Sequence, residues 1–529
     1  MTKTSPPPTS PRMRVLFFSL AGALGLAACA ASVSQPASSD ATARQSADTG
    51  RSGVVPQQAG DSYYESAASS VAARAGDSFA PKAKNVILFV GDGMGVSTVT
   101  AGRIYAGQTR GVDGESYRLT MEQLPYSAFS KTYSHDSQVS DSASTATAMM
   151  SGVKTGSRTL GLRSGVAHNN CASAEGQETD SIFEIAEAAG LATGIVSTAR
   201  ITHATPAAAY AEAANRNWED DTEVGGSGCT DIARQMVEWP AGDGFEIILG
   251  GGRGAFYPPS IADPETGDPA GRRTDGANLV DAWLSGSGER TYVYDQAGFD
   301  AVDFASDTRV LGLFEPSHMQ YELDRAEDKA GEPSLAELTR AAITRLSRDE
   351  DGYVLLVEGG RIDHGHHATN AARALGDTDA LDQAVAAALE MTDSSDTLII
   401  VTADHSHTLT IAGYPVRGNP ILGKVGYGPG GMARADDGKP YTTLGYANGM
   451  TGCKPGQEDC ARADLTDVDT TDKDFNQQAL VFSGSETHAG EDVPLYASGP
   501  GAELFRGTIE QNEIFHVMGR ASGLVTYED

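Results

Sequence analysis

Three short segments bring histidines and carboxylates together. In the first, residues 363–367 (DHGHH), Asp363 and His367 stand four positions apart, so one face of a helical turn would present both groups. The second is residues 404–407 (DHSH), and the third surrounds His488. Imidazole and carboxylate ligands together suit Zn²⁺. One such cluster is often structural or accidental, whereas three that each follow a predicted strand or turn indicate a metal centre.

Ser142 is the candidate nucleophile. It follows Asp141 at the start of an Ala-rich segment, residues 141–148 (DSASTATA), which we expect to be helical. The first turn of a helix offers free backbone N–H groups and the positive end of the dipole, which favour a bound anion and, beside a metal, a serine alkoxide. Asp-Ser before an Ala-rich helix is usually only a cap, so this assignment depends on the metal clusters.

Apolar strands are expected immediately before several of these polar residues. The runs at 86–90 (VILFV), 353–357 (YVLLV) and 398–401 (LIIV) lead into Asp92, Glu358 and Asp404, and a further run lies at 247–249. Near-continuous apolar strands are covered on both faces, as in a mostly parallel sheet between helices. Because ligands gather beyond the carboxyl ends of such strands, these acids are expected to converge.

Helical periodicity appears between the expected strands, at residues 180–189, 334–347 and 379–391. The predicted fold is therefore α/β, a three-layer sandwich with a central mostly parallel sheet. Residues 406–487 differ, because they are rich in Gly and Pro and contain an acidic stretch. We interpret them as an inserted loop-rich, crown-like subdomain.

The N-terminus has the pattern of an export signal. Basic residues precede an apolar run at 15–28, which is too short for a permanent membrane span and ends at Cys29. Small residues closing on a cysteine resemble the bacterial lipobox, so residues 1–28 are predicted to be a lipoprotein signal peptide and Cys29 the lipidated residue. Ala30 favours the outer membrane, and an ordinary signal peptide is the alternative. Residues 29–80 are poor in bulky apolar side chains and are predicted to be a flexible tether, with local packing of the short VVPQ and YYES segments as the alternative.

The composition excludes several classes of function. The 529 residues carry 71 Asp and Glu against 39 Lys and Arg, a formal net charge of −32. An electrostatic nucleic-acid binder carries a basic patch, and the sequence has no run of Lys or Arg. A protein that binds membranes through basic residues is disfavoured for the same reason.

Cysteine usage also agrees with export. With Cys29 assigned to lipid, four of the five cysteines remain, which allows three pairings. Cys453 and Cys460 flank a Pro-Gly turn that suits a local disulfide, which would leave Cys171 and Cys229 to pair across a longer loop.

Taken together, the motifs resemble the alkaline phosphatase family, with the greatest similarity to the animal tissue-type enzymes. The resemblance covers roughly residues 82–520 and implies that residues 81–529 form the catalytic domain. The matching stretches, in family order, are 90–95 (VGDGMG), 141–143 (DSA), 215–218 (NRNW), 249–253 (LGGGR), 313–316 (LFEP), 357–367 (VEGGRIDHGHH), 402–407 (TADHSH) and 486–492 (ETHAGED).

This resemblance implies hydrolysis of phosphate monoesters at alkaline pH through a phosphoserine on Ser142, with Arg216 clamping the phosphate. It implies two Zn²⁺ and one Mg²⁺ per chain. The ligands carried over are Asp363, His367 and His488 for the first zinc, Asp92, Asp404 and His405 for the second, and Asp92, Thr205 and Glu358 for magnesium. His203 and His364 would stand behind the ligands, and His366 and His407 would not be ligands.

The family also implies a calcium site, a homodimer and a Cys171–Cys229 disulfide. Phe314 and Glu315 match the calcium site and Glu332 stands for another of its ligands. Ala282 replaces one carboxylate of that site, and Asp281 is the alternative ligand there.

Two other functions are compatible with parts of the sequence. A phosphodiesterase or sulfatase of the same superfamily is disfavoured because Thr205 and Glu358 complete a third metal site and no sulfatase modification motif is found in the mature chain. A non-catalytic metal-binding lipoprotein is disfavoured by the complete set of ligands and nucleophile.

Overall fold

The computed structural model describes residues 49–76, 78–454 and 460–527. The described residues belong to one compact unit, Ser46–Asp529. The predicted signal peptide (1–28) and Cys29 lie outside them. No helix in the described part of the chain is long and apolar enough to cross a membrane.

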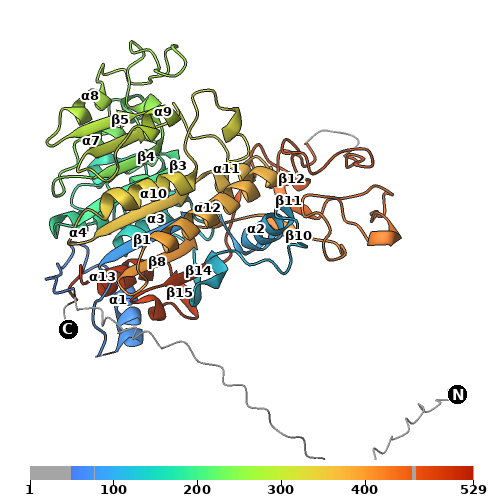
Figure 1. Ribbon diagram of the computed structural model, residues 1–529, viewed down its shortest axis with the longest axis horizontal. Coiled ribbons are helices and arrows are strands. Elements are labelled where there is room, and N and C mark those ends of the chain that lie inside the picture. Colours follow the sequence, from blue (N-terminus) through green and yellow to red (C-terminus); the bar gives the residue numbers. More distant parts are fainter. Residues whose placement is uncertain (1–48, 77, 455–459, 528–529) are drawn as a thin grey trace, which may run out of the picture. The chain divides into compact units, whose positions relative to one another are not determined.

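A ten-stranded sheet forms the centre of this unit, as predicted (Figure 1). Its order is β15-β2-β14-β8-β1-β7-β3-β4-β6-β5, and every neighbouring pair is parallel except the two pairs that involve β14. The strands are β1 (Asn85–Gly91), β2 (Tyr126–Lys131), β3 (Ala192–Arg200), β4 (Ile247–Gly251), β5 (Arg290–Val293), β6 (Arg309–Leu313), β7 (Tyr353–Gly359), β8 (Thr397–Ala403), β14 (Val493–Ser498) and β15 (Thr508–Glu510).

Helices cover both faces of the sheet, so its central strands are apolar on both sides. In β1, Ile87 and Phe89 pack into one core with α10 and α12, while Val86 and Leu88 pack into the opposite core with α4 and α13. The helices of eight or more residues are α1 (Ser62–Ala75), α2 (Val96–Thr109), α3 (Ser142–Ser151), α10 (Leu335–Leu346), α12 (Ala371–Met391) and α13 (Glu513–Ser522). The shorter α-helices are α4 (Ile182–Ala188), α5 (Ala204–Ala207), α6 (Asp221–Val224), α7 (Ile232–Val237), α8 (Leu279–Leu284), α9 (Gln296–Asp300) and α11 (Arg361–His367).

The register of the central strands brings their ends level. Gly91 of β1 lies opposite Gly359 of β7 on one side and opposite Ala403 of β8 on the other. The residues that follow β1 and β8, Asp92 and Asp404, therefore emerge at the same edge of the sheet.

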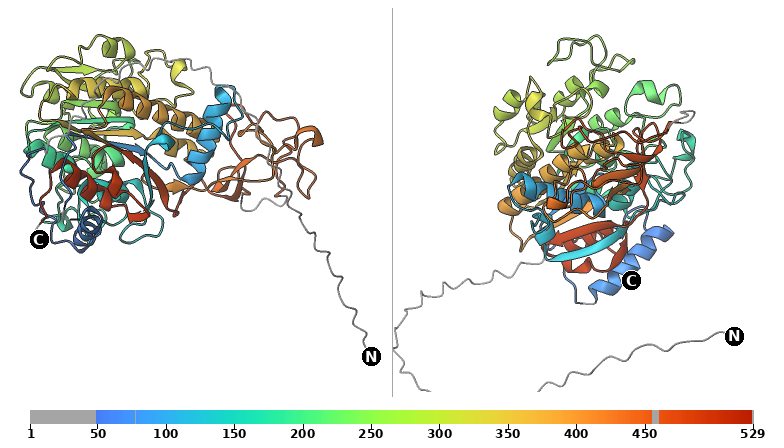
Figure 2. Two further views of the ribbon diagram at one scale, coloured as in Figure 1. Left: turned by 60° about the horizontal axis from the view of Figure 1, so that its bottom comes forward. Right: turned by 90° about the vertical axis from the view of Figure 1, so that its right-hand side faces the viewer.

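Part of the predicted tether forms helix α1 (Ser62–Ala75), so the alternative of local packing at YYES holds there. The Asp61 carboxylate caps α1 by accepting a hydrogen bond from Tyr63 N at 2.8 Å. Tyr64, Ala67 and Val71 are buried, and the Tyr64 ring lies 5.8 Å from that of Phe515 in α13. Figure 2 shows α1 in blue beside α13 in red. Only three residues of α1 are buried, and the residues around them are mostly Ala and Ser. The apolar periodicity of the helix is therefore weak in the sequence.

The segment between β8 and β14 carries a small sheet of its own, drawn in orange at the right of Figure 1. Its order is β10 (Leu409–Ile411), β11 (Leu444–Gly449) and β12 (Ala479–Phe482). At the base of the segment β9 (Ser406–His407) pairs with β13 (His488–Ala489), with His407 opposite His488. This pairing joins two of the three histidine segments.

One expected element changes its bounds, and both expected disulfides are present. Helix α12 begins at Ala371 rather than at residue 379, because the Asn370 side chain caps it by accepting from Arg373 N at 3.0 Å. Both disulfides, Cys171–Cys229 and Cys453–Cys460, are present, with Cα atoms 5.7 and 5.6 Å apart.

Candidate metal centre and nucleophile

The structure brings together side chains that are up to about 400 positions apart in the sequence. Asp92 follows β1, Ser142 begins α3, and Asp404 and His405 follow β8. Asp363 and His367 lie on α11, directly after β7, and His488 lies on β13. Each predicted position is thus at a strand end or in a short element that a strand end supports.

Ser142 faces the buried acids and imidazoles. Its side chain is 2% exposed, and its Oγ lies 3.1 Å from His405 Nε2 and 3.5 Å from Asp92 Oδ1. Asp141 caps α3 by accepting from Ala143 N at 3.2 Å, which fixes the first turn that carries Ser142. The hydroxyl is therefore held beside the groups expected to bind metal.

Asp363, His367 and His488 form the first ligand group. Asp363 Oδ1 lies 3.3 Å from His367 Nε2 and 3.4 Å from His488 Nε2. His367 Nδ1 donates to the carbonyl of Glu486 at 2.6 Å, and His488 Nδ1 donates to the carbonyl of Ser140 at 2.8 Å. Because each Nδ1 carries the proton, each Nε2 keeps a lone pair for a metal.

Asp92, Asp404 and His405 form the second group. His405 Nε2 lies 3.3 Å from Asp92 Oδ1 and 3.3 Å from Asp404 Oδ2. Burial and the neighbouring carboxylates raise the pKa of Asp92 well above its ordinary value. Burial likewise raises the pKa of Asp404. Carboxylates crowded without a counter-charge are stabilised by a divalent cation.

The third group contains polar atoms that lack partners among the described residues. Thr205 Oγ1, Glu358 Oε1 and Asp92 Oδ2 are buried without a hydrogen bond. Ligand atoms of Asp92, Glu358 and His203 lie within 4.8 Å of one another. Burial raises the pKa of Glu358 to about 8. Buried oxygens without a hydrogen bond destabilise the fold unless an ion binds them. Two carboxylates and one hydroxyl offer only oxygen ligands, which Mg²⁺ prefers.

Arg216 lies next to the nucleophile. Its Nη1 is 3.1 Å from Asp141 Oδ2, and its Nη2 donates to His203 Nε2 at 2.8 Å. The guanidinium is therefore oriented from two sides at the N-terminus of α3, where an anion is favoured.

His407 and Glu486 hold the first ligand group in place. His407 Nε2 lies 2.7 Å from Asp363 Oδ1, and His407 Nδ1 lies 2.5 Å from Glu486 Oε2. Burial alone would lower the pKa of His407, but the two carboxylates raise it to about 10. Glu486 was not expected to take this position, although it lies within the ETHAGED motif.

Two further histidines lie close to this centre. His366 is buried, with Nε2 3.0 Å from Thr98 Oγ1 and Nδ1 2.8 Å from the Tyr446 hydroxyl. His364 packs against His318 with the two rings tilted by 51° and their centroids 4.0 Å apart. His318 was not identified from the sequence, because a lone histidine in a loop carries no pattern.

Glu315, which the resemblance assigns to a calcium site, belongs to a cluster of three carboxylates. Glu315 lies with Glu265 and Asp328, whose carboxylate oxygens are all within 4.8 Å of one another. Glu332 is 2% exposed and accepts from Gln320 N at 2.8 Å, outside that group. Neither Asp281 nor Glu332 is among the three carboxylates. Glu265 and Asp328 were not expected, since 63 positions of chain separate them.

The family described as Alkaline phosphatase matches residues 83–524. The tissue-nonspecific alkaline phosphatase isozyme of Gallus gallus is 45% identical over 450 residues, which cover 83% of this chain and 84% of that protein.

Two solved structures show the same fold. The alkaline phosphatase of Thermus thermophilus is 25% identical with a TM-score of 0.61, over 84% of this chain and 92% of that one. A mutant of the alkaline phosphatase from the Antarctic bacterium TAB5, with magnesium bound in its M3 site, is 25% identical with a TM-score of 0.56, over 84% of this chain and 99% of that one.

Proposed function

Since the chain belongs to the alkaline phosphatase family, we propose that its metal-dependent hydrolysis of phosphate monoesters uses Ser142 as the nucleophile. The observation that supports this assignment most is the 3.1 Å approach of Ser142 Oγ to His405 Nε2, beside Asp92. Asp92 is shared by the second and third ligand groups, so its contact with Ser142 supports a place for the hydroxyl beside both. A serine hydroxyl is a weak nucleophile by itself and needs such surroundings.

We assign the ligands as the resemblance implies. Asp363, His367 and His488 would hold one Zn²⁺, and Asp92, Asp404 and His405 the other. Asp92, Thr205 and Glu358 would hold Mg²⁺. When bound, these ions would lower the pKa of the Ser142 hydroxyl and neutralise charge on the phosphate oxygens. The donor types and the unpartnered oxygens of Thr205 and Glu358 support this assignment.

In the proposed reaction, Ser142 Oγ attacks phosphorus, the bond from phosphorus to the ester oxygen breaks, and the alcohol leaves with a proton. Water then attacks the phosphoserine, the Oγ–phosphorus bond breaks, and inorganic phosphate is released. Arg216 binds two phosphate oxygens throughout, because its planar fork matches them. Asp141 keeps the fork aimed at the first turn of α3.

A comparison of rates on an aryl phosphate and on a bis-aryl phosphate tests this function. The proposal predicts a strong preference for the monoester and loss of turnover in Ser142→Ala. A preference for the diester would show that the site serves a different reaction.

Four finer features are also proposed. Glu265, Glu315 and Asp328 would bind Ca²⁺, with Phe314 beside them, as their clustered oxygens suggest. Calorimetric titration of the zinc- and magnesium-loaded protein with Ca²⁺ would test this site.

The protein would be exported and lipid-anchored through Cys29 at the periplasmic or outer cell surface, which mass spectrometry of the mature N-terminus would test. It would act as a homodimer, which light scattering would test.

A further inference from the structure

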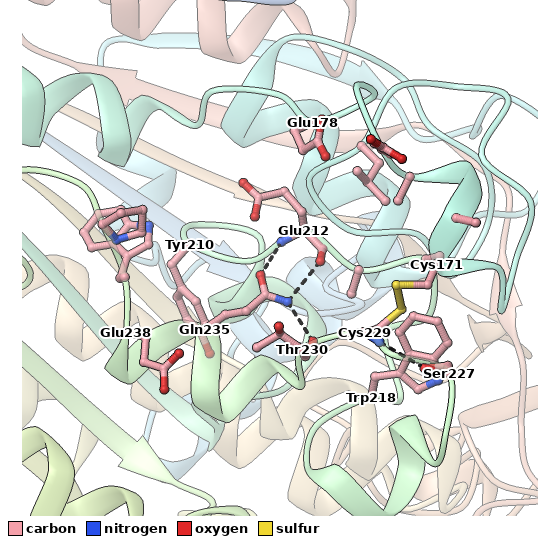
Figure 3. Close-up of a pocket in the computed structure, with 18 of the residues that line it drawn as sticks. Cys171, Glu178, Tyr210, Glu212, Trp218, Ser227, Cys229, Thr230, Gln235 and Glu238 are labelled. Atoms are coloured by element: carbon pink, nitrogen blue, oxygen red, sulfur yellow. Dashed lines mark hydrogen bonds between the residues drawn. A yellow bond between two sulfur atoms is a disulfide. The ribbon is translucent and has the colours of Figure 1, made fainter.

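A second cavity, distinct from the phosphatase centre, lies around the Cys171–Cys229 disulfide (Figure 3). Its volume is about 650 Å³, within the range of small-molecule sites. None of the proposed metal ligands, Ser142 or Arg216 lines it. The disulfide and the Glu212–Gln235 backbone contacts make its walls rigid: Glu212 N donates to Gln235 Oε1 at 2.9 Å, and Gln235 Nε2 donates to Glu212 O at 3.0 Å.

Aromatic rings form part of its wall. Tyr210, Trp218 and Trp239 line it, and these include two of the three tryptophans of the chain. Trp239 stacks on Phe245 with ring centroids 4.1 Å apart, so its position is fixed. Trp218 belongs to the buried core and is only 5% exposed, so its ring is also held in place.

The polar lining is acidic without a matching base. Five glutamates line the cavity and no Lys, Arg or His does; they are Glu175, Glu178, Glu184, Glu212 and Glu238. Glu238 is paired with Arg234 at 3.0 Å. The Glu212 carboxylate has no side-chain partner among the described residues, and burial together with Glu184 and Glu178 raises its pKa to about 8. Figure 3 shows Glu178, Glu212 and Glu238 around the cavity from three different segments.

We propose that this cavity binds a small organic cation, with its ammonium group at Glu212 and its apolar part against Trp218 and Trp239. Aromatic walls beside carboxylates are the environment that ammonium ions select. A divalent metal fits less well, because these glutamates are absent from the groups of described residues whose ligand atoms lie within 4.8 Å. Carboxylates that are spread around a volume of this size suit an extended cation better than a compact one.

Benzyltrimethylammonium, titrated into the metal-loaded protein at pH 9, tests the proposal. We expect saturable quenching of tryptophan fluorescence and matching heat in calorimetry, with no such change for benzyl alcohol or benzoate. Glu212→Gln keeps the shape of the side chain and should weaken binding about tenfold while phosphatase activity is unchanged. Glu503→Gln, an exposed glutamate outside the cavity, should bind as the wild type does.

Three results would overturn the proposal. They are binding of benzyl alcohol as tight as that of the cation, an affinity of Glu212→Gln for the cation equal to that of the wild type, and a titration with the cation that does not saturate. Quenching by Ca²⁺ that competes with the cation would assign the cavity to a metal instead. The proposed phosphatase reaction does not depend on any of these results, since no residue of the cavity takes part in it.

Discussion

Ser142 Oγ and His405 Nε2 lie 3.1 Å apart although 263 positions of sequence separate them. Helix α3 presents the hydroxyl from its first turn, and the loop after β8 presents the imidazole from the edge of the sheet. The parallel register of β1, β7 and β8 produces this approach, because it delivers Asp92 and Asp404 to one edge.

Ser142→Ala should abolish the covalent intermediate. We expect a fall in kcat of at least about a hundredfold, with any residual turnover coming from hydroxide at the metal centre. Metal content should stay unchanged, since Ser142 is buried in a preformed site. Rapid quench with a radiolabelled aryl phosphate would measure the phosphoenzyme. A variant that retained wild-type turnover would remove Ser142 from the mechanism.

Arg216→Ala should weaken phosphate binding without removing the chemistry. Losing two charge-assisted hydrogen bonds corresponds to a rise of about tenfold to a hundredfold in KM and in the inhibition constant of inorganic phosphate. Arg216→Lys keeps the charge but loses the planar fork, so it should fall between the wild type and Ala. Equal KM values in all three proteins would contradict the assigned role.

Glu486→Gln should lower the affinity for the first zinc. His407 contacts both Glu486 and Asp363, so the substitution loosens the group that orients a ligand. Losses of about tenfold to a hundredfold are typical for such partners. Glu491→Gln is the matched control, because Glu491 accepts from Ser406 and does not contact His407. Competition with a chromophoric chelator would measure zinc release, and identical behaviour of the two variants would contradict the prediction.

Asp377→Asn should stabilise the protein increasingly as pH rises. Burial in α12 raises the pKa of Asp377 to about 8. The Asp377 carboxyl group therefore binds its proton more tightly in the folded state than in the unfolded state. Its contribution to the free energy of unfolding is fully present below about pH 4 and is lost as the pH rises towards 8. The variant avoids this loss, with a limiting slope of about 1.4 kcal/mol per pH unit.

Denaturant titration at pH 5.5 and pH 8, with saturating zinc and magnesium, would measure this effect. Asp436→Asn, at an exposed position, is the control. The free energy of unfolding of this variant should differ from that of the wild type by the same amount at both pH values. A constant difference for Asp377→Asn would show that the carboxyl group is not held protonated.

The sequence predicts the central sheet well, because apolar runs mark its central strands. The same runs lead into Asp92, Glu358 and Asp404, and the register of β1 with β7 and β8 brings their ends level. The sequence is less informative where few residues carry the packing, as at α1, where only Tyr64, Ala67 and Val71 are buried. Glu265 and Asp328 come together through loops, and no local sequence pattern predicts the path of these loops. The contact of Glu486 with His407 likewise requires the β9–β13 pairing, which is formed by residues far apart in the chain.

The requirement for bound metal is best tested by measuring phosphate release from an aryl phosphate before and after the metals are stripped with a chelator. We expect the untreated protein to contain two zinc ions and one magnesium ion per chain. Stripping should abolish activity, and zinc and magnesium together should restore it. Full activity in protein shown by mass spectrometry to be free of metal would overturn the proposed metal-dependent mechanism.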